Sequence, residues 1–286
     1  MSNFRADFHL HSTCSDGILP PAQLVDLAAE QGVTLMSLTD HDSTEGIAEA
    51  REACKRHGIK LVPGSEISTD IASDEVHVLA HFLDPDDPEL QAFLSTNREG
   101  RYERGREMVT SLQRLGLDIT WDRVKEIAGD AAIGRPHVAQ ALLEKGHVAT
   151  ISEAFDLYIG RNGPAYVERI KMTPEEAIRF IVSVGGIATF AHPQFTTSTN
   201  EILPSLVEAG LSGIEVYYKD LEEEAVEGVL ALARQYDLIP LGGTDYHGLN
   251  NPGERLPGQQ VVPLPEESVE RLFARAEAMG RLHLMS

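Results

Sequence analysis

Short apolar runs alternate with segments of helical periodicity over the first hundred residues. We expect strands at 7–10, 35–39, 60–62 and 76–82, where apolar side chains run together or alternate with polar ones. Between them, residues 20–31 and 44–57 carry apolar side chains at helical spacing, and each segment stops at a glycine suited to a helix C-terminus. This alternation is typical of βαβ units, so the pattern predicts an α/β fold around a parallel sheet.

The alternation of short apolar runs with segments of helical periodicity returns after residue 172. Thr173, Pro174 and Glu176 form a helix-start signal: an N-cap, a proline at the first helical position and a capping-box glutamate. Further strands are expected at 187–190, 213–217 and 239–241. The stretch between the two parts has helical periods at 101–115, 121–128, 136–145 and 151–158 and no strand pattern. We therefore predict an α/β body of residues 1–98 and 172–286, interrupted by a mainly helical insertion over 99–171.

Charge and composition narrow the classes of protein. The chain has 45 acidic and 24 basic residues, a net charge of −21, which disfavours binding to duplex nucleic acid. It has no apolar run near the roughly 18 residues that cross a membrane, and its polar N-terminus does not resemble a secretory signal, so we expect a cytoplasmic protein without a membrane partner. Cys14 and Cys54 are expected to be free thiols.

The first expected strand alternates polar and apolar side chains. Asp7, His9 and His11 would project from one face, and two histidines spaced in this way can chelate a metal. The alternative is a surface strand with chance polar alternation, whose buried face carries Phe8 and Leu10. Metal binding is the interpretation that we favour, because the same residue types recur at the other strand ends.

Those recurrences are short motifs that close the later strands. They are Thr39-Asp40-His41, Gly64-Ser65-Glu66, Ala191-His192-Pro193 and Asp245-Tyr246-His247. In a parallel barrel, the C-terminal strand ends meet at one rim, where active sites lie. The side chains of these scattered motifs would thus form one cluster.

Taken together, the motifs resemble those of the polymerase and histidinol phosphatase (PHP) family, a group of amidohydrolase-like metal-dependent phosphoesterases. The matching segments also include the loop at Asp16 and Glu75-Val76-His77, and they extend from residue 9 to 247. The resemblance implies a distorted (β/α)7 TIM-like barrel, with the insertion over 99–171 covering the active-site cleft.

The resemblance also implies a trinuclear metal centre. One ion would be held by His9, His11, Glu66 and Asp245; Glu66 would bridge to a second, held also by His77 and His192; and a third would lie between Asp16, His41 and His247. Manganese is favoured by the resemblance, while the ligand types also suit Zn or Fe, and Mg stays open. His81 competes with His77, because both lie on the same face of one strand.

Five further residues are assigned supporting roles. Asp7 and Asp40 are expected to hydrogen-bond metal-bound imidazoles. Arg135 and His137 lie where a helix should begin, and a helix N-terminus with a guanidinium suits a phosphate. The alternative there is a capped helix with an exposed arginine. Arg161 is a further candidate for the same cleft.

The expected reaction is hydrolysis of a phosphate monoester by a metal-bridging water held by Glu66, His192 and His247. The chain is most similar to stand-alone bacterial family members that convert nucleoside 3′,5′-bisphosphates, such as adenosine 3′,5′-bisphosphate, to the 5′-nucleotide and phosphate. The partner would then be a small phosphorylated substrate, a nucleotide. The alternatives are 5′-3′ exonuclease action on short oligoribonucleotides, histidinol phosphate hydrolysis, amide-bond hydrolysis and a non-catalytic metal-binding accessory module.

Overall fold

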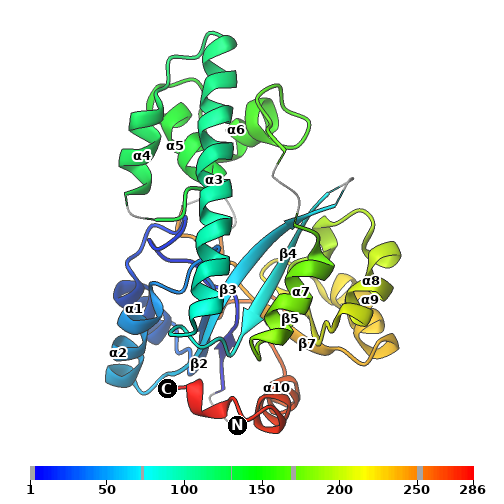
Figure 1. Cartoon of the computed structure of the whole chain (residues 1–286). Helices are drawn as coiled ribbons and strands as arrows, with labels where there is room; N and C mark the ends of the chain where they lie inside the picture. The colour runs from blue at the N-terminus through cyan, green and yellow to red at the C-terminus, as the bar shows by residue number, and fades with distance from the viewer. Residues whose placement is uncertain (1–3, 72–73, 130, 169–171, 250–253) are drawn as a thin grey trace.

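The computed structural model describes residues 4–71, 74–129, 131–168, 172–249 and 254–286. Seven strands form one sheet in sequence order, and the sheet curls until its two edges approach each other (Figure 1). Leu10 forms a parallel bridge with Tyr246, and the Phe8 N–H donates to the Gly242 carbonyl at 3.1 Å. The sheet is therefore nearly closed, and the predicted α/β barrel is confirmed.

The strands are β1 Ala6–Asp7, β2 Leu35–Leu38, β3 Lys60–Asp70, β4 Glu75–His81, β5 Ile187–Phe190, β6 Gly213–Tyr218 and β7 Ile239–Gly243. Strands β1 to β3 are parallel, as are β5 to β7, but β4 is antiparallel to both of its neighbours. The expectation of an all-parallel sheet is wrong at β4. Strand β3 does not end at residue 62 but continues to Asp70, and the short connection to Glu75 leaves room only for a hairpin.

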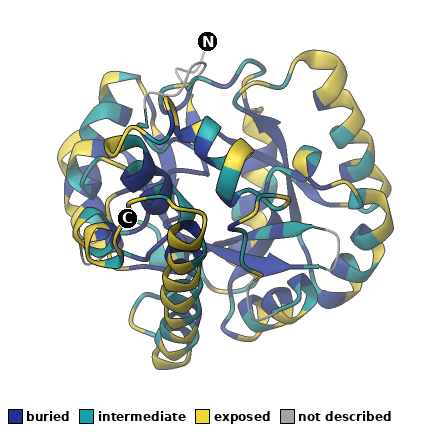
Figure 2. Cartoon of the chain, turned by 90° about the horizontal axis from the view of Figure 1, so that it is seen from above, coloured by how far each residue is buried: buried dark blue, intermediate teal, exposed yellow. Residues whose placement is uncertain are grey.

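Helices cover the outside of the barrel (Figures 1 and 2). They are α1 Pro21–Glu30, α2 Ile47–His57, α7 Pro174–Ser183, α8 Thr199–Ala209, α9 Glu223–Gln235 and α10 Glu266–Ala278, with short turns η2 Pro193–Phe195 and η3 Leu282–Leu284. The expected start of α7 is confirmed, because the Glu176 N–H donates to Thr173 Oγ1 at 3.2 Å and the Thr173 N–H donates to the Glu176 carboxylate at 2.9 Å.

The regular structure described between β4 and α7 consists of helices. It contains α3 Pro88–Arg114, α4 Trp121–Ala128, α5 Arg135–Glu144, α6 Ile151–Ala154 and the π-helix η1 Phe155–Ile159. Helix α3 begins well before residue 101, because the Asp87 carboxylate caps it by accepting the N–H groups of Glu89 and Leu90. The expected domain boundary at residue 99 falls inside this one continuous helix.

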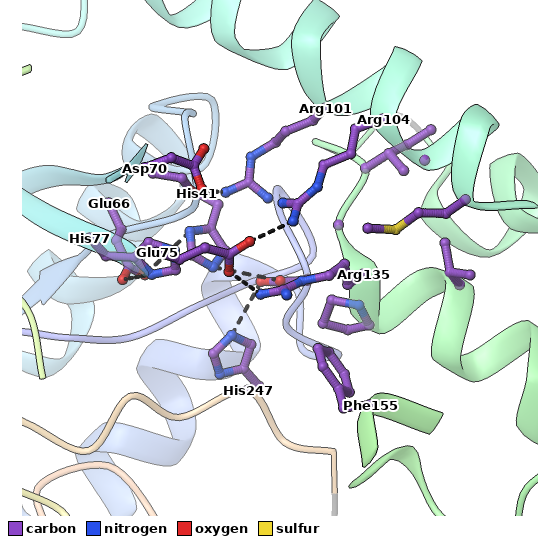
Figure 3. Close-up of a pocket in the computed structure, with 18 of the residues that line it drawn as sticks. His41, Glu66, Asp70, Glu75, His77, Arg101, Arg104, Arg135, Phe155 and His247 are labelled. Carbon is purple, nitrogen blue, oxygen red and sulfur yellow. Dashed lines mark hydrogen bonds and ion pairs between the residues drawn. The ribbon is translucent and has the colours of Figure 1, made fainter. Parts of the chain in front are cut away.

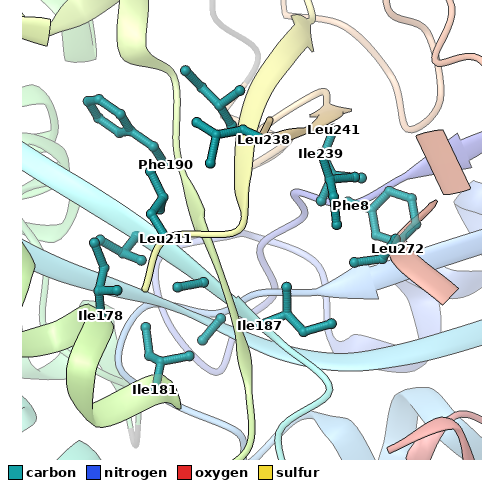
Figure 4. Close-up of a cluster of buried hydrophobic side chains, with 14 of the residues drawn as sticks. Phe8, Ile178, Ile181, Ile187, Phe190, Leu211, Leu238, Ile239, Leu241 and Leu272 are labelled. Atoms are coloured by element: carbon teal, nitrogen blue, oxygen red, sulfur yellow. The ribbon is translucent and has the colours of Figure 1, made fainter. Parts of the chain in front are cut away.

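The apolar interior is divided into three clusters. The largest cluster fills the space between the sheet and helices α7 and α10, with Ile178, Phe190 and Leu272 among its members (Figure 4). A second cluster lies under α1 and α2, and the helical segment has a core of its own around Val109 and Leu142. Helix α3 contributes to two of these cores and so ties the segment to the barrel.

Candidate metal centre and substrate cavity

The predicted ligands lie together at one rim of the barrel. His9 and His11 follow β1, His41 follows β2, His192 follows β5, and Asp245 and His247 follow β7. Glu66 lies within β3 rather than at its end. Because β4 is antiparallel, it starts at this rim, so His77 near its start reaches the cluster. His81 lies deeper in the barrel, with its ring 3.3 Å from Ser37 Oγ.

The Glu66 carboxylate is the centre of the cluster. Five imidazole nitrogens surround it: His9 Nε2 and His11 Nε2 at 3.1 Å, His41 Nδ1 at 3.3 Å, His77 Nδ1 at 2.8 Å and His192 Nε2 at 3.2 Å. Burial alone would raise the pKa of this carboxyl, but the neighbouring histidines, His41 foremost, hold it well below its usual range. A carboxylate with both oxygens facing imidazoles in this way can bridge two ions.

The residues fit bound cations. Three groups place their ligand atoms within 4.8 Å of one another: His11, Asp16, His41 and His247; His9, His11, Glu66 and Asp245; and His41, Glu66 and His77. Both His11 ring nitrogens, Asp16 Oδ1 and His41 Nδ1 are buried and make no well-directed hydrogen bond to a described residue, although oppositely charged groups of the cluster lie 3.1–3.8 Å from them. Burying such atoms unpaired is costly, and a metal ion would satisfy them.

The local field also favours positive charge. Burial would lower the pKa of His11, yet the carboxylates of Asp245 and Glu66 raise it to about 10. The second of the four-residue groups is the set predicted for the first ion. The other groups differ from the prediction: His11 joins the Asp16 group, and the group of Glu66 and His77 contains His41 in place of the predicted His192.

Glu215 supports the cluster and was missed by sequence reasoning. This buried residue of β6 places Oε1 3.0 Å from His9 Nδ1, and its Oε2 accepts the His192 N–H at 2.7 Å. A ligating histidine needs such a partner on its other nitrogen. The signal in the sequence was a lone glutamate inside an otherwise apolar strand, Gly213–Tyr218.

The structure gives Asp7 and Asp40 different partners from the expected imidazoles. Asp7 Oδ2 accepts the Thr244 hydroxyl at 2.6 Å and the Gly258 N–H at 2.8 Å. Asp40 accepts the hydroxyl groups of Ser12 and Ser15, each at 2.7 Å. Both carboxylates therefore accept their hydrogen bonds from hydroxyl and backbone N–H groups of the surrounding loops. Asp7 and Asp40 thus stabilise the loops that carry the ligands rather than the rings themselves.

Two candidate ligands have strained backbones. His192 has φ 31° and Asp245 has φ 47°, in the left-handed region that residues with a Cβ rarely adopt. The Glu215 carboxylate holds the His192 N–H, and the Tyr218 hydroxyl donates to Asp245 Oδ2 at 2.7 Å. Strain of this kind persists where surrounding contacts impose it, and it is concentrated at functional sites.

A cavity of about 290 Å³ adjoins the cluster and extends beneath the helical segment (Figure 3). Arg101 and Arg104 enter it from α3 and Arg135 from the start of α5. Arg101 Nε donates to Asp42 Oδ2 at 2.6 Å, while Glu75 pairs with both Arg104 and Arg135. Arg101 and Arg104 were not predicted. Their spacing of three positions on an expected helix was the available signal.

The three predicted phosphate-binding residues have different surroundings. Arg135 lines the cavity, and its guanidinium lies 5.3 Å from the centroid of the Phe155 ring. His137 and Arg161 lie outside the cavity lining. The His137 ring accepts the Gly134 N–H at 2.9 Å and so caps α5, and Arg161 donates to the Ile71 carbonyl at 3.2 Å. Their contacts thus hold the helical segment in place.

Comparison with known proteins agrees with this geometry. The family model of the PHP domain matches residues 7–182, more than half of the chain. A 3′,5′-nucleoside bisphosphate phosphatase of Chromobacterium violaceum is 34% identical over 253 residues, covering 87% of this chain and 88% of that protein. A 5′-3′ exoribonuclease of Haemophilus influenzae is 33% identical over 245 residues, covering 84% and 89%.

A solved structure is equally similar. An amidohydrolase from Chromobacterium violaceum with bound sulfate matches with a TM-score of 0.86 and 33% identity, covering 95% of this chain and 96% of that one. The likeness therefore extends over the barrel and the helical segment together.

Proposed function

This chain belongs to the PHP domain family and is a metal-dependent phosphoesterase, and from that premise we propose that it releases the 3′-phosphate of nucleoside 3′,5′-bisphosphates. Adenosine 3′,5′-bisphosphate would give AMP and phosphate. The observation that carries the proposal is a recess with three arginines directly beside the ligand cluster. A substrate with two phosphates can use both parts of this site.

The scissile phosphate would bind at the ligand cluster. We propose three divalent ions there, manganese foremost, held by His9, His11, Asp16, His41, Glu66, His77, His192, Asp245 and His247. Bound ions supply an activated water as nucleophile and offset the charge on the phosphoryl oxygens. The chain's own part is to hold the ligand geometry, with Glu215 on His9 and Tyr218 on Asp245.

The second phosphate would bind at the three arginines of the cavity, Arg101, Arg104 and Arg135, which we call the arginine wall. Arg104 and Arg135 present guanidinium groups that suit phosphate oxygens, and Phe155 lies beside Arg135. These cations are concentrated locally although the chain as a whole carries a net charge of −21. The overall negative charge opposes long polyanions, whereas the arginines together with bound divalent ions would offset the carboxylates that line the recess and so attract one compact phosphate. This arrangement favours a small nucleotide as the substrate.

Hydrolysis of short oligoribonucleotides is the second candidate function, and the exoribonuclease relative supports it. Its substrate would place a 5′-phosphate against the same arginines. Histidinol phosphate, with one phosphate, gives these arginines no partner. No described helix is long and apolar enough to cross a membrane, and the cytoplasmic location stays a prediction.

The test is a substrate series with the manganese-loaded protein. Adenosine 3′,5′-bisphosphate should exceed adenosine 3′-monophosphate in kcat/KM by about tenfold or more, because only the former carries the 5′-phosphate. A 5′-phosphorylated oligoribonucleotide and histidinol phosphate complete the series. Equal efficiency on the bisphosphate and the monophosphate would contradict the proposal, and a clear preference for histidinol phosphate would replace it.

A further inference from the structure

Resting on the proposed function, we propose that the exposed ring of Phe195, packed edge-on against the buried Tyr218, forms a stacking subsite for a second nucleoside, one esterified to the far side of the scissile phosphate. This subsite would let the same metal centre shorten 5′-phosphorylated oligoribonucleotides as well as hydrolyse bisphosphates. The ligand class is a short single-stranded RNA.

Phe195 is an exposed aromatic residue beside a candidate metal ligand. Its side chain is 63% exposed, the largest fraction among the exposed large apolar residues that the structure describes. Its ring centroid lies 5.9 Å from the His192 ring and 5.6 Å from the Tyr218 ring. Leaving an aromatic ring in water forgoes the stabilisation that burial would give. A nucleobase stacked on the free face would recover it.

The turn that carries Phe195 is fixed despite this exposure. The Phe195 N–H donates to the His192 carbonyl at 3.1 Å, which ties the turn to the backbone of a candidate metal ligand. Thr197 binds Asp74 through its N–H at 2.9 Å and its hydroxyl at 3.1 Å, and the Thr199 hydroxyl donates to the Pro193 carbonyl at 2.7 Å. A ring held in this way loses little conformational freedom when a ligand stacks on it.

The position of the two rings matches the path of a longer substrate. The arginine wall comes from α3 and α5, whereas Phe195 follows β5 and Tyr218 is the last residue of β6. When the first nucleotide lies against the arginine wall, the RNA beyond the scissile phosphate must leave the site on the opposite side, next to the ends of β5 and β6. Lys219 lies there, with Nζ 5.0 Å from the Tyr218 ring centroid and 3.4 Å from Asp245 Oδ2, and a metal ion on Asp245 would leave this ammonium to the next phosphate.

The two reactions would break the same bond. Water adds its oxygen to phosphorus, the bond from phosphorus to the 3′-oxygen breaks, and the 3′-oxygen takes a proton. With a bisphosphate, the released group is inorganic phosphate. With an oligoribonucleotide, it is the shortened chain, which keeps the phosphate on its new 5′ end and can enter the site again.

The experiment compares two substrates in variants of the full chain loaded with manganese. The substrates are adenosine 3′,5′-bisphosphate and a 5′-phosphorylated diadenylate. Phe195→Ala should lower the ratio of kcat/KM for the dinucleotide to that for the bisphosphate by about ten- to a hundredfold, the usual effect of losing one base stack. Phe195→Trp should keep the ratio. Leu115→Ala, at an exposed apolar residue at the far end of α3, is the matched control.

A binding measurement separates stacking from turnover. A dinucleotide with 2-aminopurine as its second base and a methylene group in place of the scissile 3′-oxygen cannot be hydrolysed. Its fluorescence should be quenched by the wild type and much less by Phe195→Ala.

The outcomes separate this inference from the proposed function. Wild-type hydrolysis of the bisphosphate with an unchanged ratio in Phe195→Ala overturns the subsite alone. Hydrolysis of the bisphosphate but not of the dinucleotide also overturns it. Failure of the wild type on both substrates overturns the proposed function and this inference together.

Discussion

Glu75 of β4 and Arg135 of α5 form an ion pair inside the cavity, next to the candidate metal centre (Figure 3). Arg104 contacts the other oxygen of Glu75 at 2.5 Å, and the Tyr166 hydroxyl donates to it at 3.3 Å. Burial would raise the pKa of the Glu75 carboxyl, but Arg135 and Arg104 hold it well below its usual range. A carboxylate thus occupies the place that we propose for the second phosphate.

Glu75→Gln should therefore tighten phosphate binding. Without the carboxylate, Arg104 and Arg135 lose a competing anion, and we expect the KM for adenosine 3′,5′-bisphosphate to fall by about tenfold, equivalent to about 1.4 kcal/mol. The KM for adenosine 3′-monophosphate should change much less. Steady-state kinetics on the two substrates decides. A rise in the KM for the bisphosphate would show that Glu75 serves mainly to position the arginines.

The same variant should be less stable without ligand. Two partly buried guanidinium groups lose their partner, at a cost of about 1–3 kcal/mol in the free energy of unfolding. Because the Glu75 pKa is depressed, the wild-type advantage is present above the usual glutamate pKa of 4.5 and is lost as the pH falls below it. Denaturant unfolding of both proteins from pH 8 to pH 3 tests this, and inorganic phosphate at neutral pH should restore the variant's Tm.

Glu66→Gln tests the bridging carboxylate. We expect more than one divalent ion per wild-type chain, fewer ions in the variant, and a turnover lower by at least about a hundredfold. Elemental analysis and steady-state assays measure the two effects. Glu52→Gln is the control, because Glu52 is exposed and contacts only Lys55 among the described ion pairs. A wild type with one ion or fewer and full activity would contradict the three-ion centre.

Glu215→Gln tests a residue that acts through its neighbours. The amide can still accept one hydrogen bond but cannot offer a charge to both His9 and the His192 N–H, so metal affinity should fall by about 10- to 100-fold. Titration of the metal-depleted protein with manganese measures this. Excess metal should restore most of the turnover. Unchanged metal affinity would leave Glu215 with a role in packing only.

Much of the fold and the cluster could be predicted from sequence because each signal was local. The strand at 187–190 and the capping box at Thr173 depend on neighbouring residues, and both are confirmed. The direction of β4 depends on how long β3 continues, and apolar periodicity does not show that length. His77 reaches the cluster because β4 is reversed.

The arginine wall could not be predicted in the same way. Arg101 and Arg104 reach the cavity only because α3 starts at Pro88 and runs across the barrel rim, which is a matter of tertiary packing. His137 was expected to bind phosphate because it lies at a helix start, yet its ring caps α5. A motif gives the residue types at a site, whereas packing decides which of their atoms face the cavity.

The thiols give a prediction about pH. Both cysteines are free, as expected, and burial with the nearby Asp40 charge raises the pKa of the Cys14 thiol to about 11, while burial raises that of Cys54 to about 12. Alkylation by iodoacetamide at pH 7.5 should be slower than that of free cysteine by at least about a hundredfold, because the thiolate is the reactive form. Mass spectrometry over time measures this rate. Rapid labelling of Cys14 would show that its loop opens.

Arg135→Ala tests the proposed substrate most directly. Removing the guanidinium deletes a charge-assisted contact of roughly 1.5–3 kcal/mol with a second phosphate, or about ten- to a hundredfold in kcat/KM for adenosine 3′,5′-bisphosphate. A simple aryl monophosphate should lose much less, with metal content unchanged. Arg123→Ala is the control, because Arg123 lies on the outer face of α4 and contacts Glu126 and Glu144.

The Arg135 variant leaves Glu75 with one arginine fewer, and that freed charge could itself repel the phosphate. The change is therefore repeated in the Glu75→Gln background, where no carboxylate remains at this position. A loss that persists there belongs to the contact between Arg135 and the phosphate, because the double-mutant comparison removes the contribution of Glu75. A loss that disappears assigns Arg135 to neutralising Glu75. Equal losses on the bisphosphate and the aryl ester would place Arg135 at the metal-bound phosphate or in folding.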